Sequence, residues 1–114
     1  MSGRDPRAFL DDIIDAIGVL RRLVAGRSLE DYSRDEPLRW AVERGLEIIS
    51  EASRHIPVEA KSDHSHLPWR QIADIGNRLR HGYHTIDDAI IWSIVQDDLD
   101  SLDSAVRAIR AGLG

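Results

Sequence analysis

Apolar residues recur every three or four positions along the chain, which is the spacing of amphipathic helices. The first such set would share one helix face: Phe9, Ile13, Ile17, Leu20 and Val24. Asp5 followed by Pro6 is typical of a helix start, because the carboxylate accepts from free backbone N–H groups and proline has no N–H to leave unpaired. Gly26 is suited to end the helix. We therefore predict a helix from Pro6 to about Val24.

The same criterion predicts three further helices. Their expected limits are near Pro37 to Pro57, Trp69 to Gly82, and Thr85 to Gly112. Thr85 and Asp88 resemble a capping box at the start of the last helix, with aspartate in place of the usual glutamate.

Two polar stretches separate these helices. We expect "SLEDYSRDEP" to be a polar connection that includes one short helical turn around Leu29 to Tyr32, and "PVEAKSDHSHLP" to be a loop. The histidines and aspartate of "DHSH" are metal-ligand types, but no third ligand matches them in spacing, so we predict no metal site there.

Long helices with short connections predict an all-α fold, an antiparallel bundle of four to five helices. The length of 114 residues suits a single domain over 1–114. Because a bundle this small could leave one apolar stripe uncovered, a homodimer is a plausible hypothesis.

The composition excludes several classes of protein. There are no cysteines, so disulfides, thiolate metal sites and cysteine nucleophiles are excluded. No apolar run has the length of a signal peptide or a membrane span, so we expect a cytoplasmic protein without a membrane anchor. The net charge of −5, from 15 basic against 20 acidic residues, argues against general nucleic-acid binding by long-range attraction.

One stretch has the opposite sign. Between Trp69 and Thr85 there is a single acid, Asp74, against five basic residues: Arg70, Arg78, Arg80, His81 and His84. Any contact with RNA should therefore use this local cluster.

The run "GNRLRHGYH" carries the candidate chemistry. At about 100° per residue, Asn77, Arg78 and His81 can share one side of the third predicted helix, and Arg80 points about a quarter-turn away. Histidine exchanges a proton near neutral pH, and arginine is a permanent donor to phosphate oxygens. This set meets the needs of RNA cleavage without a metal, with a base for the 2′-hydroxyl and a cation for the transition state. Basic residues are also favourable at any helix C-terminus, so a solvated helix end explains the cluster as well.

Four blocks of the chain, in order and spacing, resemble HepT-like proteins of the HEPN group, the toxins of MNT/HepT toxin–antitoxin pairs. The blocks are "FLDDIIDAI", "AVERGLEIISEAS", "LPWRQIADIGNRLRHGY" and "IDDAIIWSIVQDDLDSL". The resemblance implies a helical dimer whose two Arg/His motifs face a shared cleft, and a metal-independent endoribonuclease without a cofactor. It also implies a nucleotidyltransferase-type antitoxin that transfers AMP to the tyrosine two residues after the histidine, here Tyr83.

The chain departs from the family motif at one position. The motif has arginine, asparagine, three residues and histidine, and Asn77 and His81 match its last two fixed positions, but Gly76 stands where arginine is expected. Arg78 or Arg80 could replace the missing guanidinium. Alternatively, the protein is a non-catalytic helical dimer that binds a partner or a nucleotide.

Glu51 matches an acid that the family has on its second helix. We expect it either to pair with Arg78 or Arg80 across the bundle or to be a solvated carboxylate.

Overall fold

The structure, a computed structural model, describes residues 5–81 and 86–113. Its elements, in chain order, are α1 (Pro6–Val24), α2 (Leu29–Arg34), α3 (Glu36–Ser53), α4 (Val58–Ser62), α5 (Trp69–Arg80), α6 (Asp88–Ser93), a π-helical turn η1 (Ile94–Asp98) and α7 (Leu99–Gly112). Strands are absent from this part of the chain, and none of its helices is long and apolar enough to cross a membrane.

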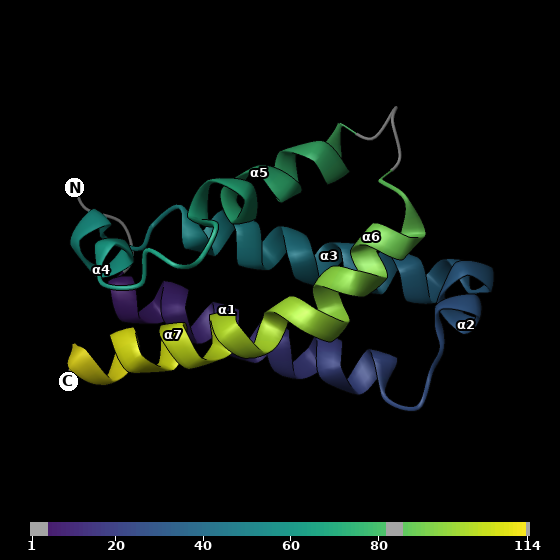
Figure 1. The fold of residues 1–114 in the computed structure, drawn as a ribbon, viewed down its shortest axis with the longest axis horizontal. Helices are drawn as coiled ribbons and strands as arrows, with labels where there is room; N and C mark the ends of the chain where they lie inside the picture. The colour runs from purple at the N-terminus through teal and green to yellow at the C-terminus, as the bar shows by residue number, and fades with distance from the viewer. Residues whose placement is uncertain (1–4, 82–85, 114) are drawn as a thin grey trace.

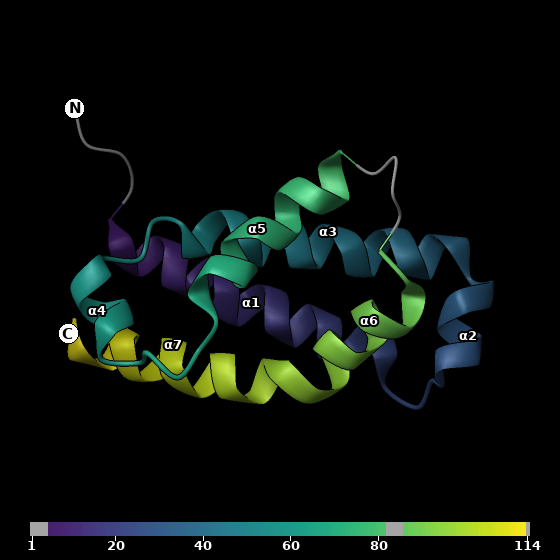
Figure 2. The same cartoon turned by 45° about the horizontal axis from the view of Figure 1, so that its top comes forward.

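The long helices form an antiparallel bundle, which confirms the predicted all-α fold. α3 lies between α1 and α5, and α7 packs against α1 (Figure 1). Successive long elements run in opposite directions, so α1 begins and α7 ends at the same end of the bundle (Figure 2).

The apolar stripes predicted from the sequence meet in one core. The buried side chains of α1 include Leu10, Ile13, Ile17 and Leu20, and those of α3 include Val42, Leu46 and Ile49. The α7 stripe is completed by Leu102, Val106 and Ile109. Removing these side chains from water is the main favourable contribution to folding.

The start of α1 follows the prediction. The Asp5 carboxylate accepts a hydrogen bond from the Arg7 backbone N–H, 2.9 Å away, and Pro6 takes the first helical position. Gly26, two residues after the end of α1, has a φ of +72°, a conformation that glycine adopts without steric cost.

The two polar stretches contain more helix than the sequence predicted. α2 is a full element, because the Ser28 hydroxyl accepts from the Asp31 N–H while the Asp31 carboxylate accepts from the Ser28 N–H, at 3.1 and 3.0 Å. This reciprocal cap lies in the predicted polar connection. The predicted loop after Pro57 contains α4, so that expectation was wrong.

The fourth predicted helix is real but not continuous. Its described N-cap is Asp87, whose carboxylate accepts from the Ala89 N–H at 2.9 Å; Thr85, the predicted cap, lies outside the described residues. The helix is interrupted by η1 between α6 and α7. π-helical turns of this kind are rare and occur frequently at functional sites.

Candidate functional site

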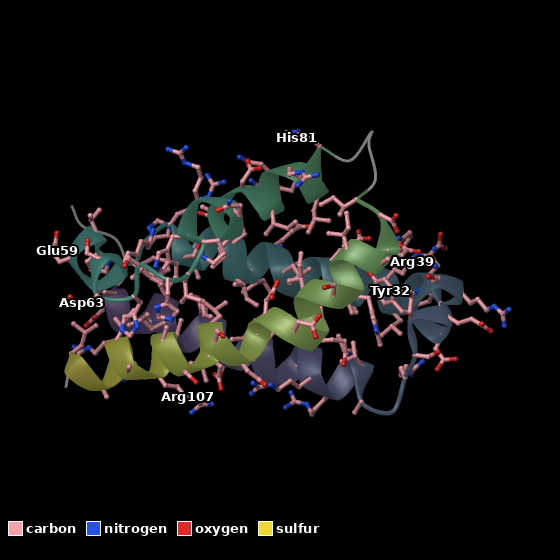
Figure 3. All side chains as sticks on the ribbon, in the orientation of Figure 1. Tyr32, Arg39, Glu59, Asp63, His81 and Arg107 are labelled. Carbon is pink, nitrogen blue, oxygen red and sulfur yellow. The ribbon has the colours of Figure 1, made fainter. Side chains whose placement is uncertain are left out.

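The last turn of α5 brings together Asn77, Arg80 and His81. The helix ends at Arg80, and His81 is its C-cap residue, whose backbone N–H donates to the Asn77 carbonyl at 3.0 Å. The His81 side chain is exposed at the outer end of α5 (Figure 3). Its ring is therefore open to a large substrate.

Arg80 folds back along the helix. Its Nη2 donates to the Asn77 Oδ1 at 2.5 Å. Its Nη1 lies 3.6 Å from the place where a Cβ of residue 76 would be. The expectation that Arg80 points away from this group was wrong, because a long side chain can reach back across one helical turn.

Arg78 faces another surface. It lines a groove between α5 and the α6–η1–α7 segment, together with Asp74 and Ile75 of α5 and Ile90 of α6. Arg80 thus contacts Asn77 while Arg78 lines the groove, and which of the two arginines binds phosphate stays a prediction.

Gly76 is buried at the contact between α3 and α5. Its N–H donates to the Ser50 Oγ at 3.0 Å, and the same hydroxyl donates to the Ala73 carbonyl at 2.8 Å. A Cβ on residue 76 would lie 2.7 Å from the Ser50 Oγ and 2.9 Å from its Cβ. Any larger side chain here would separate the two helices, which is a reason for glycine that the sequence alone did not reveal.

The guanidinium groups of Arg78 and Arg80 are both accessible to an anionic ligand. Arg78 and Arg80 are exposed, and within the described ranges neither forms an ion pair with a carboxylate. A guanidinium that is not paired with a carboxylate can bind an anionic ligand without first breaking an ion pair within the protein.

Glu51 does not support this group. Its Oε2 lies 3.4 Å from the Nε2 of His55, four residues further along the chain and just beyond the end of α3. The His55 ring in turn stacks on Phe9, with ring centroids 4.1 Å apart. Glu51 is exposed and belongs to this separate contact, so the solvated-carboxylate alternative describes it better than a pair with Arg78 or Arg80.

Tyr83, the predicted modification site, lies outside the described residues, as does His84.

The groove beside Arg78 is mainly apolar. It has a volume of about 420 Å³ and is lined by Leu46, Ile49, Ile72, Ile75, Ile94, Leu99 and Leu102, among others. Asp98 of η1 also lines it. Ile90 stands at this groove with 53% of its surface exposed.

The described residues contain no group of three or more histidines, aspartates or glutamates placed to hold a metal ion. In the "DHSH" segment the rings of His64 and His66 are 6.0 Å apart. The His64 carbonyl accepts from the Trp69 indole N–H at 3.0 Å, which ties this segment to the start of α5.

Comparison with known proteins places these features in context. A family profile described as "Ribonuclease HepT-like" matches residues 13–109. A "Probable ribonuclease HepT" of Thermococcus cleftensis is 35% identical, over 94% of this chain and 97% of its own length. Relatives from Caldanaerobacter subterraneus and Methanocaldococcus jannaschii, provisionally named RNases, are 35% and 32% identical and are covered over 95% and 100% of their lengths. No solved structure matches the chain significantly.

Proposed function

The chain belongs to the HepT-like ribonuclease family, and we propose that it is an endoribonuclease toxin that uses the last turn of α5 as its active site. The observation that carries this proposal is the exposed His81 ring at the same helix end as the Arg80 guanidinium, which has no carboxylate partner among residues 5–81 and 86–113.

In the proposed reaction, the His81 imidazole takes the proton of a ribose 2′-hydroxyl. The 2′-oxygen then bonds to the neighbouring phosphorus and the bond to the 5′-oxygen breaks. The protonated His81 returns its proton to the departing 5′-oxygen, which leaves a 2′,3′-cyclic phosphate and a 5′-hydroxyl. The Arg80 guanidinium stabilises the negative charge on the phosphorus oxygens in the transition state. Asn77 positions Arg80 through the hydrogen bond from Nη2 to Oδ1. The reaction needs no metal, so we expect cleavage to continue in the presence of EDTA.

A matched set of variants tests these roles. His81→Ala and Arg80→Gln should each lower the cleavage rate of a fluorescent RNA by a factor of about 100 or more, the usual contribution of a general base or of one transition-state donor. Arg78→Gln removes the same charge two residues away and should have a much smaller effect. Folding of each variant is checked by circular dichroism.

If the His81→Ala variant cleaves RNA as fast as the parent protein, the proposed active site is wrong. If Arg78→Gln is the inactive variant and Arg80→Gln the active one, the roles of the two arginines are reversed.

The alternative is a non-catalytic helical dimer that binds a partner or a nucleotide. It is favoured by Gly76, because the position of the motif arginine is taken up by the contact with Ser50. If the purified parent protein leaves RNA intact over many hours and its expression does not inhibit cell growth, this alternative is favoured. Replacing Gly76 by arginine is not a clean test of it, because Ser50 would have to move.

We also propose a nucleotidyltransferase-type antitoxin as partner, which would neutralise the toxin by transferring AMP to Tyr83. The support is family membership together with a tyrosine two residues after His81. Mass spectrometry of the protein produced with and without its neighbouring gene checks this. We expect added AMP on the peptide that contains Tyr83 only in the first case, and AMP on another residue, or on none, would contradict it.

Finally, we propose a homodimer in which the groove beside Arg78 contacts a second copy of the chain. The groove supports this because it exposes apolar side chains, Ile90 among them, next to the candidate site.

A further inference from the structure

The arginines of this chain fall into two groups. Seven of those in the described part form ion pairs with carboxylates: Arg7, Arg21, Arg27, Arg34, Arg44, Arg107 and Arg110. Six others form none within residues 5–81 and 86–113: Arg22, Arg39, Arg54, Arg70, Arg78 and Arg80. Four of these six lie on α5 or, in the case of Arg54, are bonded to it. In a protein of net charge −5, this is a local concentration of uncompensated positive charge.

Arg54 is held against the middle of α5 from the end of α3. Its Nη2 donates to the Ala73 carbonyl at 2.7 Å. This bond uses one of five guanidinium N–H groups, so the others remain available to a ligand. Together with Arg70, Gln71, Ala73 and Asp74, Arg54 lines a shallow depression beside the first turns of α5. Asp74 supplies one negative charge there against two positive ones.

This depression and the candidate site share one face of α5. At 100° per residue, Arg70, Asn77, Arg80 and His81 fall within a sector of about 100°. Ala73, the residue bonded to Arg54, lies within the same sector. The apolar groove that contains Arg78 lies on the adjoining side of the helix, and Gln71 and Asp74 line both the groove and the depression. A second chain in that groove would leave Arg54, Arg70 and Arg80 open, because none of these three lines it.

The two ends of the face, Arg70 and His81, are about 16.5 Å apart along the helix axis, from eleven residue steps of 1.5 Å each. A few nucleotides of an extended strand cover that distance. A row of cationic side chains along such a face can bind the phosphate backbone of single-stranded RNA without recognising its base sequence.

We infer that single-stranded RNA lies along this face of α5, and that Arg54 and Arg70 bind backbone phosphates a few nucleotides away from the bond cut at His81. The inference rests on the proposed ribonuclease function and adds a substrate track to it. The track makes affinity depend on RNA length, because only a strand long enough to reach Arg54 and Arg70 gains their contacts.

The test uses the double variant Arg54→Gln with Arg70→Gln in the full chain. Its control is Arg22→Gln with Arg34→Gln, which has the same net charge but alters exposed arginines of α1 and α2. Binding of labelled 2′-O-methyl RNA, which cannot be cut by attack of the 2′-oxygen, is measured by fluorescence anisotropy for a trinucleotide and a ten-nucleotide strand at several salt concentrations.

We expect the parent to prefer the longer strand and the double variant to bind it about tenfold more weakly, with a salt slope smaller by about 1.4, since each single-strand phosphate contact contributes about 0.7. The control should match the parent. The variant Arg54→Lys with Arg70→Lys retains both charges and should keep most of the salt slope of the parent. It therefore distinguishes the loss of positive charge from the loss of the hydrogen bond between Arg54 and the Ala73 carbonyl.

A double variant with the affinity and salt slope of the control would overturn the track while leaving the ribonuclease proposal in place, provided that the parent binds and cuts RNA. A parent that neither binds nor cuts RNA would overturn the proposed function and the track together.

Discussion

At the scale of single residues, Gly76 and Ser50 decide how close α3 and α5 can be. The Ser50 hydroxyl accepts from the Gly76 N–H and donates to the Ala73 carbonyl, so one side chain bridges two backbone groups of the neighbouring helix. The same closeness places the Arg80 guanidinium beside residue 76. A position that departs from the family motif thus has a structural reason, and Arg80 offers a guanidinium at the site from one turn further along.

Gly76→Ala should destabilise the protein. The added Cβ would lie 2.7 Å from the Ser50 Oγ, and overpacking of this kind costs about 1–3 kcal/mol, which exceeds the gain of about 1 kcal/mol that alanine brings in a helix. Gly18→Ala is the matched control, because a Cβ there meets only the end of the Arg22 side chain at 3.6 Å. Thermal unfolding should show a lower midpoint for the first variant and a higher one for the second.

If Gly76→Ala is as stable as the parent, α3 and α5 are further apart than described. Combining it with Ser50→Gly, which removes both atoms that the new Cβ would meet, should recover part of the loss.

At the scale of elements, the periodicity of apolar residues predicted the long helices well, because one buried face is enough to define a helix of three or more turns. α1 has the predicted limits, and the third helix begins at Trp69 as predicted. The described start of α3 is one residue before Pro37.

Short elements were less predictable. α4 has only five residues, none of them buried, so it is too short to show an apolar period. The cap of α2 was visible in "SLED", since serine and aspartate three residues apart satisfy each other's backbone, but Tyr32 gave no apolar period with its neighbours. Tyr32 of α2 is fully buried, with its ring centroid 5.6 Å from that of Trp92. Its hydroxyl has no hydrogen-bond partner in the described part, and burial raises its pKa above the ordinary value.

The π-helical turn η1 could not be predicted. Its residues continue the apolar spacing of the helices on both sides, so the sequence pattern does not distinguish it from them. Ile94 and Asp98, its first and last residues, line the groove.

At the scale of the whole molecule, charge and apolar surface are distributed unevenly around α5. One side presents guanidinium groups without carboxylate partners in the described ranges, and another presents the apolar groove. These two surfaces suit different ligands, an anionic strand and a second protein chain.

Ile90→Glu should convert the proposed dimer into a monomer. A charge at this half-exposed groove position would lose its water on association without gaining a partner. Val58→Glu is the control, because Val58 of α4 is 72% exposed and lies outside the groove. Light scattering at micromolar concentration should give a dimer for the parent and the control and a monomer for Ile90→Glu. A parent that is already monomeric, or an Ile90→Glu protein that remains dimeric, would contradict the proposed interface.

The sequence by itself determined the helical class, the positions of the long helices and the residues that carry the candidate chemistry. Periodicity and residue type are local properties, so His81, Asn77 and the surrounding arginines could be identified without coordinates. Only the tertiary structure decided that Arg80 rather than Arg78 contacts Asn77, that Gly76 is required by Ser50, and that Arg54 reaches α5 from another helix. These are contacts between side chains several residues apart or on different helices, and they depend on how closely and at what angle the helices pack, which no local pattern encodes.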